Sequence, residues 1–259
     1  MLSSRVLDLI VDHLHDEPAT LKMCCVVSKS WVPRTQRHLF AHVKFHSAGP
    51  SFESWMKAFP DPSNSPAHHT RNLQLSGSKV ITVAITEGHP WLHSFNHLVD
   101  LLLSTFDRDD IGKDDIGEDD RHISFTQLHG LSPTLKSLHI FSFLIPPPVV
   151  LDFICSFPLL EDLSLFSTQF PLLGDADEWD APPTPPKFTG SLVLSDNDPR
   201  TTRKLLDLPG GLHFSKISVL CPPRDCGLAK ELVSKCSSTL ESLRVGFDDG
   251  TFSTISVLD

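Results

Sequence analysis

The sequence has no apolar run of about 18 residues, the length that a membrane-spanning helix needs. Its N-terminus lacks the charged-then-apolar pattern of a secretory signal. Basic residues are in deficit, with 22 Lys and Arg against 32 Asp and Glu, and the net charge of −10 argues against a general nucleic-acid surface. The cysteines show no spacing typical of a disulfide framework; they are Cys24, Cys25, Cys155, Cys221, Cys226 and Cys236. We therefore expect a soluble protein of a reducing compartment, in the cytoplasm, the nucleus or both.

Motifs of catalysis are also missing. The sequence contains no nucleophile elbow, no phosphate-binding glycine loop and no zinc-protease helix. His13 and His15 lie two positions apart on an expected helix and therefore face different ways. Cys221 and Cys226 have no second ligand pair at zinc spacing. We expect no enzymatic activity, no cofactor and no metal site.

The N-terminal residues predict three short helices. Residues 5–15 carry an apolar stripe at helical spacing, made of Val6, Leu7, Ile10, Val11 and Leu14. A second helix is expected to begin near Pro18, since proline is tolerated at the first helical position, and a third after Ser28. Three helices in about forty residues are too few to enclose all their apolar groups, because domains this small bury little surface. The module therefore needs a partner or a neighbouring domain.

This segment resembles the F-box, a motif with a leucine-rich first helix followed by a valine, a small residue, a basic residue and a tryptophan. The residues that carry the resemblance are Leu2, Val6, Leu7, Ile10, Leu14, Leu21, Val27, Lys29 and Trp31, with Ser28 as the small residue. Residues 13–40 are most similar to F-box proteins of fungal type. The opening departs from the family, which usually begins Leu-Pro and then an acidic residue, where this chain has Leu2, Ser3 and Arg5.

The resemblance implies that these residues bind the Skp-type adaptor and, through it, the cullin of a ubiquitin ligase. The charge pattern is compatible with an acidic partner, because residues 22–44 contain no Asp or Glu. Their cations include Lys22, Lys29, Arg34, Arg37 and Lys44. Two other interpretations stay open: an ordinary three-helix packing unit whose stripe faces inward, and a helix-turn-helix DNA reader, which the acidity of the chain opposes.

The rest of the chain repeats a pattern of three apolar residues, spaced three and then two apart. The clear copies are Leu135-Leu138-Ile140, Leu160-Leu163-Leu165, Phe214-Ile217-Val219 and Leu240-Leu243-Val245, and the weaker copies are Leu73-Leu75, Leu98-Leu101-Leu103 and Leu192-Leu194. The middle positions 138, 163, 192, 217 and 243 lie 25, 29, 25 and 26 residues apart. That period is typical of leucine-rich repeats, whose length is about 20–29 residues. Helical spacing upstream of strands, at 149–155, 201–206 and 228–236, supports this interpretation.

The resulting fold prediction is α/β: a three-helix F-box followed by a leucine-rich-repeat-like solenoid. Its parallel sheet would form the concave face, and helices or loops the convex face. We predict a helical module at 1–45, a linker or junction at 46–69, and the solenoid at 70–259 with acidic insertions at 107–120 and 175–186. Phe52, Trp55, Met56 and Phe59 are expected to pack at the junction. Residues 245–255 would fold back as a hairpin cap, unless the chain is truncated.

Side chains between the apolar marks should point to the concave face. The candidates for binding a client protein are Gln74, His139, Ser164, Ser218 and Arg244, flanked by Lys136, Ser137, Asp162, Lys216 and Ser242. The alternative is that this face is a plain solvated surface. Both acidic insertions are expected to be solvated loops, and Trp179 in the second is a candidate anchor for a partner.

The first insertion also comes close to a calcium-binding loop. Five residues fall on its positions one, three, six, nine and twelve: Asp107, Asp109, Gly112, Asp115 and Glu118. The fifth position is Ile111, which cannot bind a cation, and the eighth is Asp114, where an apolar residue normally packs. A plain acidic loop is the preferred interpretation.

The function predicted from these patterns is a non-catalytic substrate-recognition adaptor. The helical module would bind the Skp-type subunit, and the repeats would bind a client for ubiquitination. The alternative is a repeat scaffold for protein interactions whose F-box is vestigial and acts outside a ubiquitin ligase. A third hypothesis is a calcium-regulated binding protein.

Overall fold

A computed structural model describes most of the chain. The described residues are 4–47, 49–105, 125–129, 131, 133–142, 147–166, 185–195, 199–220, 226–246 and 252–256. Several predictions fall outside these ranges: those on Leu2 and Ser3, the insertion at 107–120 with its calcium-loop pattern, residues 175–184 of the second insertion with Trp179, and Cys221. The four cysteines whose side chains are described, Cys24, Cys25, Cys155 and Cys236, are free thiols.

Among the described residues, nine strands form one sheet whose spatial order is the order of the chain. The strands are β1 (His42–Phe45), β2 (Asn72–Ser76), β3 (Asp100–Ser104), β4 (Ser137–Phe141), β5 (Asp162–Phe166), β6 (Ser191–Ser195), β7 (Lys216–Leu220), β8 (Ser242–Gly246) and β9 (Phe252–Ser256). All neighbours from β1 to β8 pair in parallel, and β9 pairs with β8 in the antiparallel sense. The architecture is therefore an α/β ladder of parallel strands, as an array of leucine-rich repeats would form.

The predicted repeat sets the register of this ladder. Leu138 pairs with Leu163 and, strand by strand, the row continues through Leu192, Ile217 and Leu243. On the other side it continues from Leu138 through Leu101, Leu73 and Val43. The repeat marks are thus confirmed, and the weak copies at 73 and 101 are true members. A one-residue slip would turn each inward leucine to the opposite face, so the apolar marks fix the pairing.

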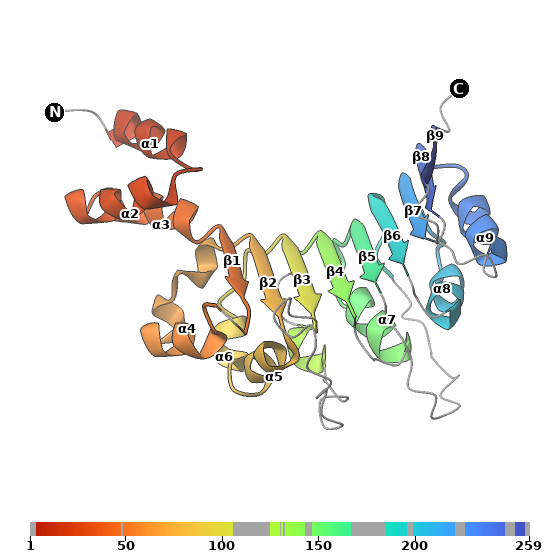
Figure 1. Cartoon of the computed structure of the whole chain (residues 1–259), viewed down its shortest axis with the longest axis horizontal. Coiled ribbons are helices and arrows are strands. Elements are labelled where there is room, and N and C mark those ends of the chain that lie inside the picture. The colour runs from red at the N-terminus through yellow and green to blue at the C-terminus, as the bar shows by residue number, and fades with distance from the viewer. Residues whose placement is uncertain are drawn as a thin grey trace.

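In the part of the chain that the structure describes, helices cover one face of the sheet and none lies over the other (Figure 1). They are α4 (Phe52–Ala58), α5 (Ser78–Thr86), α6 (His89–Leu92), α7 (Pro147–Cys155), α8 (Pro199–Leu206) and α9 (Cys226–Cys236), with short 3-10 turns η1 (Pro62–Asn64), η2 (Pro66–His69) and η5 (Phe125–Leu128). The helices predicted at 149–155, 201–206 and 228–236 are confirmed by α7, α8 and α9. Their apolar sides and the inward leucines of the strands form one continuous core.

The junction at 46–69 is structured and contains α4, η1 and η2. Ser51 caps α4, its side chain accepting a hydrogen bond from the Ser54 amide. Phe52 is buried, and the Trp55 ring contacts the rings of Phe40, Phe45, Phe59 and Phe95. The predicted aromatic packing at the junction is confirmed, and it joins the N-terminal helices to the first repeats.

Both ends of the sheet differ from the simplest repeat pattern. Residues 42–45, which the sequence analysis assigned to the helical module, form β1 because Val43 and Phe45 alternate with outward-facing His42 and Lys44 and can pair with β2. At the other end β8 and β9 form the predicted hairpin. The connection between them is too short for a parallel crossover, which needs a dozen residues or more.

Among the described residues, no helix has the length and apolar content needed to cross a membrane.

Candidate partner-binding surfaces

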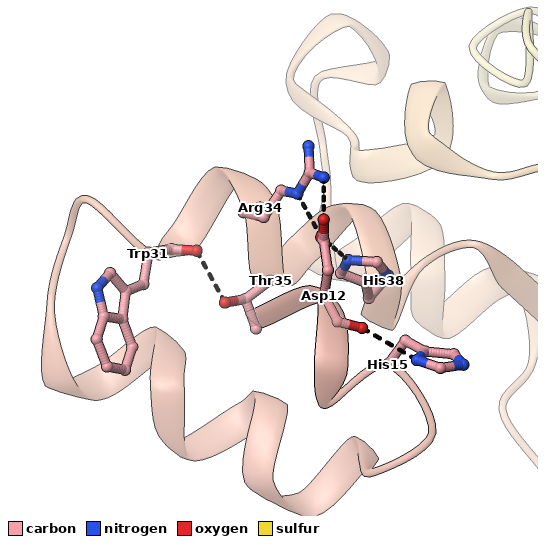
Figure 2. Close-up of polar contacts among 6 residues, drawn as sticks. All are labelled: Asp12, His15, Trp31, Arg34, Thr35 and His38. Carbon is pink, nitrogen blue, oxygen red and sulfur yellow. Dashed lines mark hydrogen bonds and ion pairs between the residues drawn. The ribbon is translucent and has the colours of Figure 1, made fainter. Parts of the chain in front are cut away.

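The N-terminal module is built around its third helix. The helices are α1 (Ser4–His13), α2 (Pro18–Val27) and α3 (Val32–Leu39), and both α1 and α2 pack on α3. A small set of buried side chains fills the space between them: Val11, Leu21, Cys24 and Thr35. The Thr35 hydroxyl is satisfied because it donates a hydrogen bond to the Trp31 carbonyl at 2.8 Å, as Figure 2 shows. In the whole chain, the module lies at the β1 end of the sheet (Figure 1).

A polar cluster holds α1 to α3 (Figure 2). Arg34 donates from Nε to Asp12 Oδ1 at 2.6 Å, and its terminal nitrogen donates to Asp12 Oδ2. His38 Nε2 lies 2.7 Å from Asp12 Oδ1. The hydrogen bonds from Arg34 and then His38 hold the pKa of the Asp12 carboxyl far below its usual range. A two-point guanidinium–carboxylate pair is directional, so it fixes how α1 lies on α3.

This packing leaves large apolar side chains of α1 and α2 in solvent. We define the apolar helix surface as Val6, Leu9 and Ile10 of α1 with Met23, Val26 and Val27 of α2. Leu9 is 67% exposed and Val26 is 81% exposed, values unusual for side chains of this type. Only two other large apolar residues among the described side chains are exposed, Val149 and Leu159. Exposed apolar groups are therefore concentrated on this module, which is typical of a protein-binding surface.

The predicted adaptor-binding residues divide into three groups. Val6, Ile10, Val27 and Lys29 are exposed, while Leu7, Leu14 and Trp31 are half-buried. Leu21 has to be removed from the binding set, because only 1% of it is exposed and it packs inside the module.

The sequence analysis missed Leu9, Met23 and Val26, all of which are exposed. The spacing of Met23, Val26 and Val27 at i, i+3 and i+4 was a readable signal for the α2 part. Leu9 carried no such signal, since it lies off the main stripe of α1.

The predicted basic rim is smaller than the sequence suggested. Lys22, Lys29, Arg37 and Lys44 are exposed, as a rim requires. Arg34 is half-buried and its charge is neutralised by Asp12, which comes from α1. Residues 22–44 contain no acid of their own, but the fold brings one in. The remaining lysines and Arg37 still give this part of the module a positive charge.

The uncovered face of the sheet is the second candidate surface. The register places all the predicted client-binding residues in one row, running from Lys44 through Gln74, Leu102, His139, Ser164, Val193 and Ser218 to Arg244. Ser164 is only 5% exposed, so it is the least accessible of them. The structure therefore brings these positions together as one surface across β1 to β8.

Acidic groups on this face are bound within the protein. His139 Nε2 lies 3.7 Å from Asp100 Oδ2 on the neighbouring strand. Asp162 Oδ1 accepts hydrogen bonds from the Ser191 amide at 2.6 Å and from its hydroxyl at 2.7 Å. The Ser137 hydroxyl donates to the other carboxylate oxygen of Asp162 at 3.2 Å. These contacts tie β4, β5 and β6 together at their starts.

Among the described residues, no three His, Cys, Asp or Glu side chains come together in a way that would hold a metal ion. No protein-family model matches the chain, and a search of the curated proteins finds no match.

Proposed function

We propose that the chain is a substrate-recognition adaptor of a Skp–cullin–F-box ubiquitin ligase. The N-terminal module is the F-box in this proposal, and the strands and helices that follow are degenerate leucine-rich repeats. The observation that carries the proposal is the apolar helix surface, which the rest of the described chain does not cover. An internal packing unit would turn these side chains toward the sheet instead.

The exposed apolar side chains are large enough for their burial to contribute substantially to the free energy of binding. Burying one large aliphatic side chain contributes about 1.5–3 kcal/mol relative to leaving it in water. Leu9, Met23 and Val26 are each more than half exposed, at 67%, 65% and 81%. Covering three such residues offsets a substantial part of the entropy lost on association. These residues are therefore expected to contribute a large share of the binding free energy of a complex.

The positive charge next to the apolar helix surface favours an acidic partner. Lys22 of α2 and Lys29, two residues beyond the end of α2, are exposed and flank Met23, Val26 and Val27 in the sequence. Cations at the rim of an apolar surface accelerate encounter with an acidic protein and disfavour basic ones. The Skp-type adaptor of the resemblance would have to present an apolar groove with acidic margins.

The sheet would supply the client site in the same proposal. The protein would contribute no bond-making chemistry, since other subunits transfer the ubiquitin. Its effect would be to raise the local concentration of client lysines near the transferring enzyme. The row from Gln74 to Arg244 faces away from the helices and is the surface assigned to the client.

Capture of a purified Skp-type adaptor by the full chain tests the proposal. Wild type should retain the adaptor, while Ile10→Asp and Val27→Asp should each weaken capture at least about tenfold, because a charge would replace an exposed apolar contact. Leu159→Asp is the matched control, since Leu159 is also exposed, at 52%, but precedes β5. Circular dichroism should show that all variants fold. Failure of the wild type to capture the adaptor would exclude this function.

One observation favours the alternative of a repeat scaffold whose helical module has a different partner. Arg5 is exposed in the first turn of α1, where the family usually has an acidic residue and where the helix dipole disfavours a cation. Under this alternative Arg5→Glu would not increase adaptor capture. A gain in capture by Arg5→Glu would count for the F-box assignment instead.

A further inference from the structure

Two histidine side chains meet on the short helix α6. His89 is the first residue of α6 and His93 follows its last residue, and residues four apart on a helical turn are neighbours on one face. His89 Nε2 lies 3.1 Å from His93 Nε2, and the ring centroids are 4.4 Å apart with planes inclined by 85°. His93 is exposed and His89 is half-buried, so solvent reaches the pair. The sequence analysis did not single out these two residues, although their spacing was readable.

Contacts on both sides of α6 hold the two imidazoles near this arrangement. The Trp91 indole donates from Nε1 to the Phe59 carbonyl oxygen at 2.7 Å, and the Ser94 hydroxyl donates to the Pro62 carbonyl oxygen at 2.9 Å. Leu92 is 1% exposed and belongs to the core. The helix also packs against α5 (Figure 1). A backbone fixed in this way reduces the entropy that is lost when two side chains bind one ion.

The distance between the two nitrogens is that of a metal chelate. Imidazole nitrogen binds zinc at about 2.0–2.1 Å, so an ion shared by two nitrogens 3.1 Å apart would make an angle of about 100° with them. This angle lies between the right angle of square-planar or octahedral sites and the tetrahedral angle. Without an ion, the same contact is a hydrogen bond in which one neutral ring donates and the other accepts. Both Nε2 atoms thus already face the inside of the pair.

The donor atoms select the class of ion. Imidazole nitrogen suits Cu²⁺, Ni²⁺ and Zn²⁺, whereas Ca²⁺ and Mg²⁺ prefer carboxylate and carbonyl oxygen. In the described part of the chain, no third His, Cys, Asp or Glu side chain joins the pair. Water would therefore fill the remaining positions around the ion. Structural zinc sites have four protein ligands, so a site with two is expected to exchange its ion readily.

We propose that His89 and His93 form a two-histidine site for a divalent transition-metal ion, with Cu²⁺ bound more tightly than Ni²⁺ or Zn²⁺. The ion would take the place of the proton between the rings, and that proton would leave to solvent. It would also join the two ends of α6, where the backbone hydrogen bond from the His93 amide to the His89 carbonyl is long, at 3.4 Å. A bound ion should therefore tighten this turn. The inference is independent of the proposed function.

Titration of the full chain with CuCl₂ and with ZnCl₂, followed by calorimetry, tests the proposal. Wild type should bind one ion per chain at its tightest site. His89→Gln and His93→Gln should each weaken this binding at least about tenfold, since even a change outside the ligands often costs that much. His68→Gln is the matched control, because His68 also belongs to a close histidine pair but donates from Nδ1 to the Ser65 carbonyl oxygen. Circular dichroism should show that all variants fold.

The variants are needed because the sequence has 14 histidines, some of which will bind metal weakly. Equal affinity of wild type and both glutamine variants at positions 89 and 93 would overturn the proposal. A ratio of one ion to two chains would also overturn it, since the ion would then be shared between copies. Protons should compete with the ion, so binding should weaken between about pH 7.5 and about pH 5.5. Binding that does not change over this range would contradict imidazole ligands.

Nuclear magnetic resonance of the wild type tests the site without any variant. A small amount of Cu²⁺ should broaden the ring signals of His89 and His93 before those of the other histidines. Zn²⁺ should slow hydrogen exchange of the His93 amide, because the ion holds the turn closed, and it should not do so in His89→Gln. Earlier broadening at another histidine would place the tightest site elsewhere and end the proposal. Adaptor capture concerns α1 and α2, so its failure would leave this result standing.

Discussion

The carboxylate of Asp162 occupies the space that a side chain at Gly190 would need. A Cβ at position 190 would lie 2.4 Å from Asp162 Oδ1 and 3.1 Å from the Glu161 carbonyl oxygen. The carboxylate cannot retreat freely, because it accepts two hydrogen bonds from Ser191 and one from Ser137. The segment that precedes β6 can therefore lie this close to β5 only because residue 190 has no side chain.

Gly190→Ala is expected to destabilise the sheet by about 1–3 kcal/mol, the usual cost of overpacking, measured by urea unfolding. Adding Asp162→Ala should cost less in this background than in wild type, because the clash is relieved at the same time. Gly227→Ala is the control: an added Cβ there meets nothing within 4 Å, so stability should be unchanged or slightly raised. Full additivity of the Gly190 and Asp162 changes would contradict this account.

The link between Asp12 and Arg34 predicts a pH effect in the helical module. Because the pKa of the folded Asp12 carboxyl is lowered, its stabilising contribution is complete above the unfolded value of about 3.9 and disappears only as the pH falls through the lowered pKa. Both side chains are still 32–34% exposed, so solvent screening limits the pair to about 1 kcal/mol.

Arg34→Gln should therefore raise the pKa of Asp12 toward its ordinary value, and carbon NMR of the carboxyl group would measure the change. Amide exchange along α1 should become faster in the variant at neutral pH, since the helix is held less firmly to α3. An unchanged Asp12 titration would show that Arg34 does not hold the carboxylate in solution.

Truncation of Phe153 on α7 is expected to cause the largest loss of stability among the variants considered. It is fully buried, with ring centroids 4.7 Å from Phe125 and 5.1 Å from Phe157. Phe153→Ala should cost about 3–5 kcal/mol, because it removes buried apolar area and leaves a cavity between α7 and η5. Leu159→Ala should change the free energy of unfolding by no more than about 0.5 kcal/mol, since this leucine is 52% exposed. Equal costs for the two variants would contradict the assignment of Phe153 to the core.

The sheet was predictable because each repeat has to turn the same apolar position inward. Leu138, Leu163 and Ile217 therefore stand in one row, as their spacing indicated. β1 was not found, since its four residues follow directly on the F-box-like run and have no clear repeat before them. A strand of that length becomes recognisable only once Val43 is seen opposite Leu73.

The apolar helix surface was only partly predictable. Helical periodicity shows that Val6, Ile10 and Val11 share a stripe, but not which of them meets a neighbouring helix. That choice depends on how α1 lies on α3, and Asp12 fixes it through Arg34 and His38, more than twenty residues away in sequence. Val11 is consequently buried, while Val6 and Ile10 are exposed. Pairwise contacts of this kind leave no periodic trace in one sequence.

The ionisation of the Cys155 thiol on α7 is expected to make the stability of the repeats depend on pH in alkaline solution. Burial, and then the nearby Asp152, raise the pKa of Cys155 from 9.0 to about 12. In the unfolded chain the thiol ionises near its ordinary value, so the folded state loses stability as the pH rises from about 9 toward 12. Iodoacetamide at pH 8, followed by peptide mass spectrometry, should label Cys155 slowly in the native protein and quickly in urea, because the thiolate is the nucleophile. Cys155→Ser should reduce the alkaline loss between those pH values while leaving neutral unfolding cooperative; burial also raises the pKa of Cys236, so part of the loss should remain. Rapid native labelling of Cys155 would mean that α7 opens far more often than its place against the core allows.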